Sequence, residues 1–109
     1  MTKSIIIDTD AGIDDIVSIL MTLQHPGVSV KALTVVHGNV PLDRGLENAK
    51  FINDLIEQGH MKTLTRIPIY AGCAVPLIQG LHPIYLWEGH GPDGLGGFTL
   101  SEEFAKFQV

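Results

Sequence analysis

Residues 5–15 read IIIDTDAGIDD and decide the fold, because they join a short apolar run directly to an acidic turn. An apolar triplet that stops at carboxylates and a glycine, followed by helical periodicity, is typical of a buried strand that ends at a ligand site. The pattern predicts a strand over Lys3–Ile7, a tight turn, and a helix over Ile13–Leu23. The polar residues of the turn are therefore expected at the carboxyl edge of a sheet.

The acidic turn favours a bound cation, because four aspartates within residues 8–15 repel one another. Asp14 and Asp15 fall in the first turn of the predicted helix, where the helix dipole favours negative charge by about 0.3–1 kcal/mol per exposed group. That effect leaves Asp10, which precedes the helix, unexplained. If the turn folds back, the carboxylates of Asp10 and Asp15 face the same small volume. Oxygen-only ligands suit calcium or magnesium better than zinc.

Three other interpretations of the acidic turn were weighed. An EF-hand needs an acidic or amide residue at its fifth position and a glutamate at its twelfth; counted from Asp8, these positions hold Gly12 and Ile19, so it fails. A phosphatase with an aspartyl nucleophile also places Asp-x-Asp after a strand, although Gly12 replaces the Thr or Val that is usual there. Helix capping by solvated acids is the third, and it gives no role to Asp10.

The rest of the chain alternates apolar runs with helical periodicity. Further strands are predicted over Val28–Val36 and Ile67–Ala71, with a helix over Leu42–Ile56 between them. This order implies right-handed crossovers and a parallel sheet of Rossmann-like βαβαβ order, with both helices on one face and the other face uncovered. A long loop is predicted over Gly72–Gly97, and capping-box spacing predicts a short helix after Thr99. The chain of 109 residues is expected to form a single α/β domain over 1–109.

Three polar segments follow the three predicted strands. The acidic turn follows the first strand, Asn39 follows the second, and the glycine-rich loop around His90 follows the third. Because ligands of parallel sheets bind at the carboxyl ends of the strands, we expect these segments to converge at one site.

Composition excludes several classes of protein. Apolar residues make up 45% and charged residues 17%, which predicts a packed core, and the net charge of -5 argues against nucleic acid and anionic membrane surfaces as partners. No apolar run approaches the roughly 18 residues that a membrane span needs, and the residues before Asp8 are too few for a signal-peptide core. The lone Cys73 allows no internal disulfide, is expected to be a small buried hydrophobe, and suits a reducing cytoplasm.

Several separated segments carry motifs of one family. In chain order they are Ile5–Leu20, Ala32–Asn39, Glu47–Ala49, Pro68–Cys73 and His90–Gly96. With Asp-Thr-Asp-x-Gly-x-Asp-Asp in the first of them, the chain resembles the nucleoside hydrolases, the inosine-uridine-preferring nucleoside N-ribohydrolases. Two departures are Ala11, where the family usually carries proline, and Ile16, where a small residue is common. Members of the family are much longer, so the resemblance is to the amino-terminal part of a nucleoside hydrolase fold.

The resemblance implies calcium-dependent hydrolysis of the N-glycosidic bond of ribonucleosides to ribose and free base, as in nucleoside salvage, with magnesium less favoured. It implies that Asp10 is a metal ligand and the general base and that Asp15 is the second metal ligand. Asp14 would accept a hydrogen bond from a ribose hydroxyl, and Asn39 would orient the sugar. His90 would protonate the departing base or pack against it. The preference for purine or pyrimidine bases stays open.

Two further functional hypotheses stay open beside the hydrolase. One is a truncated, non-catalytic domain that still binds the metal, and the weaker one is a magnesium-dependent aspartyl phosphatase with Asp8 as nucleophile. A homo-oligomer is expected, because one face of the apolar sheet lacks a covering helix.

Overall fold

Three parallel strands form the sheet of this protein. The computed structural model describes residues 1–61, 65–78, 87–91 and 93–97. Strands β1 (Lys3–Thr9), β2 (Val28–Val35) and β3 (Ile69–Ala71) pair in the order β1-β2-β3. The predicted parallel α/β sheet with βαβαβ order is therefore confirmed.

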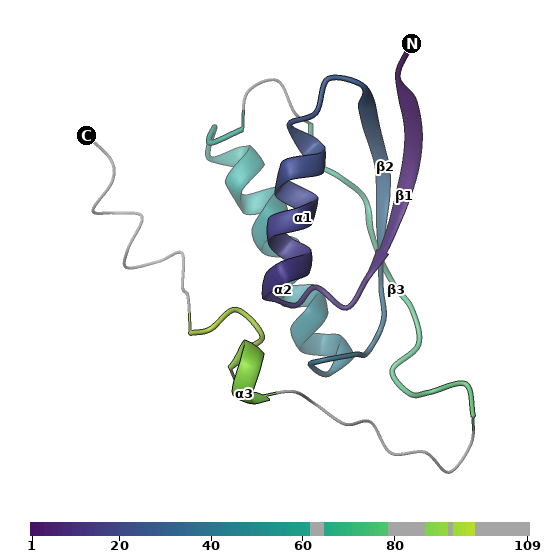
Figure 1. The fold of residues 1–109 in the computed structure, drawn as a ribbon, viewed down its shortest axis with the longest axis vertical. Helices are drawn as coiled ribbons and strands as arrows, with labels where there is room; N and C mark the ends of the chain where they lie inside the picture. The colour runs from purple at the N-terminus through teal and green to yellow at the C-terminus, as the bar shows by residue number, and fades with distance from the viewer. Residues whose placement is uncertain (62–64, 79–86, 92, 98–109) are drawn as a thin grey trace.

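Two helices connect the strands. Helix α1 (Ile13–Leu23) follows β1, helix α2 (Leu42–Glu57) follows β2, and both lie on the same face of the sheet (Figure 1). Within the part of the chain that the structure describes, no helix combines the length and the apolar character that a membrane span requires.

The strand ends differ slightly from those predicted. Strand β1 runs two residues further than Ile7, because Asp8 and Thr9 continue the ladder and pair with Thr34 and Val35 of β2. Strand β3 begins at Ile69, two residues later than predicted. The acidic turn between β1 and α1 is therefore shorter than the sequence pattern indicates.

The core lies between the sheet and the two helices. Leu33 and Val35 of the central strand β2 are fully buried, at 0% exposure. Residues of both helices and of the segment before β3 complete the cluster: Ala11, Ile16, Ile19, Leu23, Ala49, Ile52, Ile56, Met61 and Ile67. Both helices thus pack against one face of the central strand. This packing fixes the position of the strand ends.

Helix α1 buries only part of the apolar pattern that predicts it. Ile13, Ile16, Val17 and Leu20 recur at helical spacing, yet the exposed fractions of Ile13 and Val17 are 38% and 54%. The buried residues of the helix are Ile16, Ile19 and Leu23. The helix is apolar on several sides, so periodicity alone cannot choose which side faces the core.

Among the described residues, no helix covers the sheet face opposite α1 and α2. Ile6 of β1 and Tyr70 of β3 are 66% and 58% exposed. Side chains alternate between the faces of a strand, so both point away from the helices that cover their neighbours Ile7 and Ile69. In the described part of the chain, these exposed side chains agree with the expectation that one face lacks a covering helix.

The region predicted as one long loop contains a helical turn, α3 (Trp87–His90). The backbone N–H of Gly96 donates to the carbonyl of His90 at 2.7 Å, which closes the chain back onto this turn. The prediction missed it because a single turn has too few residues to show periodicity. Cys73, expected to be buried, is exposed just after the short edge strand β3. The helix predicted after Thr99 lies outside the described residues.

Candidate functional site

The turn between β1 and α1, together with the residues that flank it, forms the carboxylate loop (residues 8–15). Ala11 has a φ of 55°, in the left-handed region that costs a residue with a side chain roughly 1–2 kcal/mol. Its backbone N–H donates to Oγ1 of Thr9 at 2.9 Å, and its side chain is completely buried. Proline is fixed near a φ of about −65° and could not adopt this conformation, so alanine permits the turn that is observed.

Asp15 folds back over this turn from the first turn of α1. Its Oδ2 accepts a hydrogen bond from the hydroxyl of Thr9 at 2.6 Å and one from the backbone N–H of Asp10 at 3.3 Å. The structure therefore brings the two predicted metal ligands together, and the Thr9 hydroxyl holds Asp15 in this position. Sequence reasoning missed Thr9, although a hydroxyl between two aspartates was a usable signal.

Asp10 is held by backbone donors from two segments. Its Oδ1 accepts from the N–H of Gly12 at 3.1 Å, and its Oδ2 accepts from the N–H of Asn39 at 2.8 Å. A Cβ at Gly38 would lie 2.3 Å from Oδ2 of Asp10, so only glycine allows this approach. Asn39 thus meets Asp10 through its backbone, at the edge where the sequence predicted the two would converge.

The two carboxylates differ in how they hold protons. Burial raises the pKa of Asp10, but hydrogen bonds from Asp15 and from the backbone N–H groups of Asn39 and Gly12 bring this pKa below its ordinary value. Burial, the carboxyl of Asp10 and the nearby negative charges raise the pKa of Asp15, although the Thr9 hydroxyl opposes this. Asp10 therefore stays ionised while its crowded neighbour resists ionisation, as expected where a cation is needed to balance two acids.

The donor set fits part of a metal site. Among the described residues, no group of three or more His, Cys, Asp or Glu side chains is arranged to hold a metal ion. Asp10 and Asp15 nevertheless offer hard carboxylate oxygens with unbalanced negative charge, which suit calcium or magnesium. Calcium takes six to eight oxygen ligands, so these two residues can supply only part of its shell.

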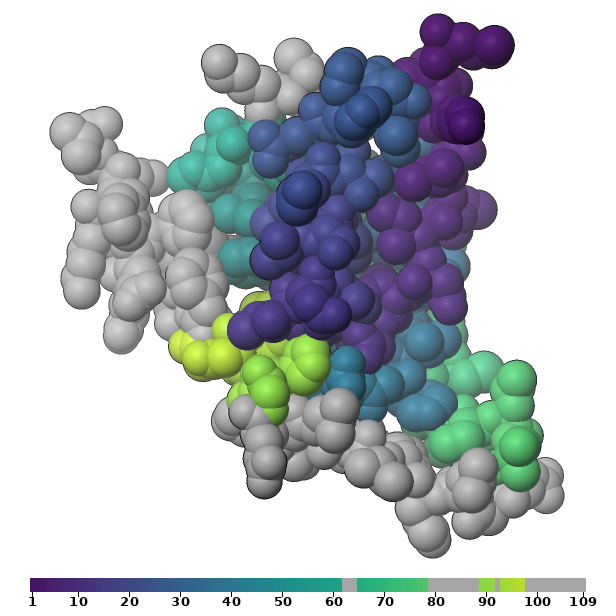
Figure 2. All heavy atoms as spheres, viewed as in Figure 1, coloured from purple at the N-terminus to yellow at the C-terminus, as the bar shows by residue number. Residues whose placement is uncertain are grey.

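His90 lies over the start of α1. It belongs to the histidine segment (residues 87–91 and 93–97), which Figure 2 shows in green and yellow against the beginning of α1. Its Nδ1 accepts a hydrogen bond from the backbone N–H of Ile13 at 3.3 Å and lies 4.0 Å from Oδ1 of Asp14. The side chain of His90 is 14% exposed and that of Asp14 is 74% exposed. The structure thus brings His90 and Asp14 together beside the carboxylate loop.

A buried asparagine of α2 joins the two segments. Asn48 is 3% exposed, and its Nδ2 donates to the carbonyl of Ala11 at 3.1 Å and to that of Asp93 at 2.9 Å. Sequence reasoning did not select Asn48. The available signal was an amide placed directly beside Ala49 on the apolar face predicted for that helix.

Asp8 does not take part in this arrangement. Its Oδ1 accepts a hydrogen bond from the hydroxyl of Thr34 at 2.6 Å, across from β2. Side chains alternate along a strand, so Asp8 lies on the opposite face of the sheet from Thr9. The carboxylates at the site are Asp10, Asp14 and Asp15.

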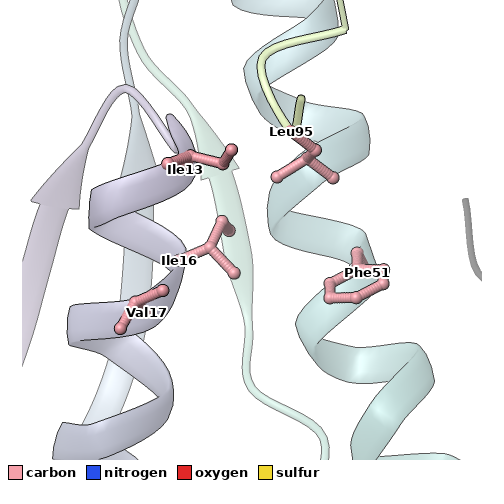
Figure 3. Close-up of a pocket in the computed structure, with 5 residues that line it drawn as sticks. All are labelled: Ile13, Ile16, Val17, Phe51 and Leu95. Atoms are coloured by element: carbon pink, nitrogen blue, oxygen red, sulfur yellow. The ribbon is translucent and has the colours of Figure 1, made fainter. Parts of the chain in front are cut away.

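An apolar pocket of about 260 Å³ lies beside the site, between α1 and α2. It is lined by Ile13, Ile16, Val17, Phe51 and Leu95 (Figure 3). These side chains carry no polar group that could orient a sugar or a base. Leu95 of the histidine segment forms part of this apolar lining, and the carboxylate loop is the candidate site.

Comparison with known proteins identifies the family. The profile of the family described as "Inosine-uridine preferring nucleoside hydrolase" matches residues 5–108. A protein of that name from Leishmania major is 33% identical over 104 residues, which cover 95% of this chain and 31% of the relative. The "Pyrimidine-specific ribonucleoside hydrolase RihA" of Shewanella baltica is 36% identical over 102 residues, covering 94% of this chain and 30% of the relative.

A solved structure agrees with the sequence relatives. The "Inosine-Guanosine Nucleoside Hydrolase (IG-NH)" superimposes with a TM-score of 0.71 at 37% identity, covering 97% of this chain and 30% of that structure. The chain spans about 30% of the length of the relatives that it matches. With a profile match over residues 5–108 and a shared fold, the chain belongs to the inosine-uridine preferring nucleoside hydrolase family.

Proposed function

We propose that this chain hydrolyses the N-glycosidic bond of ribonucleosides to ribose and free base, with calcium as the ion bound at the carboxylate loop. The observation that supports this most is the convergence of Asp10 and Asp15 at the end of β1, where the Thr9 hydroxyl and the Asp10 N–H both bond to Asp15. The names of the relatives add support, since they describe hydrolases of inosine, uridine and other ribonucleosides.

Hydrolysis of a glycosidic bond passes through an oxocarbenium-like sugar and needs a nucleophilic water, a nearby negative charge and a proton for the leaving group. A divalent cation, when bound, lowers the pKa of its water. Asp10 is the general base in this proposal, because its ionised carboxylate would lie beside the cation-bound water and can accept a proton from it. Asp15 supplies the second carboxylate for the cation.

The remaining residues would bind the sugar and the base. The exposed carboxylate of Asp14 can accept a hydrogen bond from a ribose hydroxyl, which would favour ribosides over deoxyribosides. The side-chain amide of Asn39 would orient the sugar beside Asp10. Because Nδ1 of His90 accepts the N–H of Ile13, the imidazole N–H is on Nε2, from which it can donate a hydrogen bond to the departing base.

The test is hydrolysis by the purified chain in calcium, with inosine, uridine and p-nitrophenyl riboside as substrates. We expect Asp10→Ala to abolish riboside cleavage and calcium binding. Glu57→Gln is the matched control, because Glu57 is an exposed acid at the last residue of α2, at the other end of that helix from the first turn, which packs on Asp10. Comparing inosine with uridine measures the base preference.

Two outcomes would contradict the proposal. Measurable calcium affinity without turnover of any riboside would indicate a non-catalytic, metal-binding domain. Release of phosphate from p-nitrophenyl phosphate in magnesium, abolished by Asp8→Asn, would indicate an aspartyl phosphatase.

We also propose that the chain forms a homo-oligomer through the uncovered face of its sheet. Exposed Ile6 and Tyr70 support this, because a bare apolar face favours association. A monodisperse monomer in sedimentation measurements would contradict it.

The exposed thiol of Cys73 suits a reducing compartment, and we propose a cytoplasmic location. Recovery of the native protein from a secreted fraction would argue against that location.

A further inference from the structure

Asn48 is the residue that connects the two halves of the candidate site. Its side chain is 3% exposed, so its hydrogen bonds form inside the protein, where an unmatched amide would be costly. Its single nitrogen Nδ2 donates to the carbonyl of Ala11 and to that of Asp93. An amide nitrogen has two hydrogens, and each is therefore used on a different segment.

On the carboxylate side, the bond falls at the strained position of the loop. Ala11 has a left-handed backbone and lies between Asp10 and Gly12, whose N–H binds the Asp10 carboxylate. The bond from Asn48 holds the carbonyl of the peptide that joins Ala11 to Gly12, and the N–H of the same peptide donates to the Asp10 carboxylate. Asn48 therefore fixes the peptide that bonds to the proposed general base.

On the histidine side, the bond fixes a segment that is held together by its own hydrogen bonds. The carboxylate of Asp93 accepts the N–H groups of Leu95 and Gly97 at 2.9 Å and 3.0 Å. Gly96 in turn donates to the carbonyl of His90 at 2.7 Å. Holding the carbonyl of Asp93 therefore holds His90.

Gly94 packs directly on the amide of Asn48. A Cβ at Gly94 would lie 2.8 Å from Nδ2 of Asn48, and its φ of 78° is also unfavourable for other residues. Leu95 lines the apolar pocket between the helices (Figure 3). Apolar packing is not directional, so Leu95 can hold the segment near α1 but cannot set its exact position. The directional bonds of Asn48 can.

We propose that Asn48 is a positioning residue: by bonding the peptides at Ala11 and Asp93, it sets His90 at a defined place relative to the carboxylates of Asp10 and Asp15. The consequence of this placement for catalysis rests on the proposed function. The expected effect of losing Asn48 is displacement of His90 while the carboxylate loop keeps its internal bonds.

The test compares Asn48→Leu with Asn53→Leu. Asn53 is a matched control, because it is also a buried asparagine of α2, 1% exposed, and it bonds only to the backbone N–H and carbonyl of Ile67, both at 2.8 Å, among the described contacts. The readout is the ¹⁵N NMR spectrum of the His90 imidazole at neutral pH without metal or substrate. It reports the tautomer that the bond from Ile13 to Nδ1 selects.

We expect the two variants to differ in this spectrum. In Asn48→Leu, the His90 nitrogens should move to the averaged shifts of a solvated histidine, while in Asn53→Leu they keep their wild-type values. If Asn48→Leu does not fold, Gly94→Ala replaces it, since the added methyl group pushes the segment away from Asn48 without changing that residue. Wild-type His90 shifts in the folded variant, or an equal change in Asn53→Leu, would overturn the proposal.

Kinetics separate this inference from the proposed function. If the wild-type protein cleaves ribosides, Asn48→Leu should lower kcat by about 10²-fold with little change in KM, because a misplaced group affects the reaction more than substrate binding. If the wild-type protein cleaves none, the proposed function fails, and the NMR comparison still decides the role of Asn48.

Discussion

The carboxylate loop and the histidine segment meet at one edge of the sheet but are held there in different ways. In the loop, the side chains of Thr9 and Asp15 and the carboxylate of Asp10 bond to neighbours within the same few residues. The histidine segment reaches the site through partners far away in the chain, such as Ile13 for His90 and Asn48 for Asp93. The loop is therefore held mainly by local bonds, with Asn39 and Asn48 as its long-range partners, whereas the position of the histidine segment depends on long-range bonds.

This difference separates cation binding from the placement of His90. A local loop keeps its shape when distant contacts are lost, whereas a segment held by a few long-range contacts opens at low free energy. Substitutions at the contacts of the histidine segment should therefore leave the carboxylates of Asp10 and Asp15 able to bind a cation. Only changes at the loop itself, or at the backbone that touches it, should abolish binding.

The largest effect is expected for Gly38→Ala. Its Cβ would lie 2.3 Å from Oδ2 of Asp10, so the carboxylate must turn away from its bond with the N–H of Asn39. We expect calcium affinity, measured by titration calorimetry, to fall by about 10–100-fold, as for other losses of a group that orients a ligand. Gly89→Ala is the control, because a Cβ there meets nothing within 4 Å. Equal affinities for the two variants would show that Asp10 is not a ligand.

The second effect concerns the histidine segment alone. Leu95 is partly buried against the core, so Leu95→Ala should remove about 1–2 kcal/mol from the stability of this segment, less than for a fully buried leucine. Hydrogen exchange should then speed up at Gly96 and Gly97 but not at Gly12. Leu77→Ala provides the control, since Leu77 is 94% exposed. Faster exchange at Gly12 would contradict the separation of the two regions.

The same distinction explains what could be predicted from the sequence. The strands, the two long helices and the edge at which the polar residues gather follow from apolar runs and spacing. The convergence of Asp10 and Asp15 could be anticipated because the two are only five positions apart. The side of α1 that faces the core could not, because Ile13 and Val17 are as apolar as the residues that are buried there.

The long-range contacts also could not be predicted from the sequence. An asparagine on an apolar helix face, such as Asn48, indicates that a buried hydrogen-bond partner exists, but it does not identify that partner. The bond between Nδ1 of His90 and the N–H of Ile13 joins residues that share no local pattern. These pairs form only when the folded chain packs distant segments against one another.

The third prediction tests the charge balance within the carboxylate loop. The pKa of Asp15 is raised above its ordinary value by burial and by the neighbouring acids, so the native state binds this proton more tightly than the unfolded state does. Stability is therefore lost as pH rises through this pKa, and the ionised group destabilises the metal-free chain at pH 7. We expect Asp15→Asn to raise the metal-free Tm by a few degrees at most at pH 7 and to have no such effect below about pH 4.

Calcium should reverse the order of stability of the wild-type protein and Asp15→Asn. A ligand that binds only the native state stabilises it by mass action, and Asp15→Asn removes part of the binding site. In millimolar calcium, thermal unfolding should therefore show the wild-type protein as the more stable of the two. A variant that stays more stable in calcium would argue against a cation between Asp10 and Asp15.

The smallest effect is expected at Asp93, in the histidine segment. Burial raises its pKa, but the N–H groups of Gly97 and Leu95 and the charge of Arg44 bring it below its ordinary value. A lowered carboxyl pKa contributes stability that is present above the unfolded pKa and lost as pH falls through the folded pKa. The amide NMR shifts of Leu95 and Gly97 should therefore titrate together below about pH 4, while that of Asn39, which reports on Asp10, follows a separate curve. Asp93→Asn should remove the first titration and leave the second, because the two regions bind their protons independently. A single shared titration of all three amides would show that the carboxylate loop and the histidine segment respond to pH as one unit.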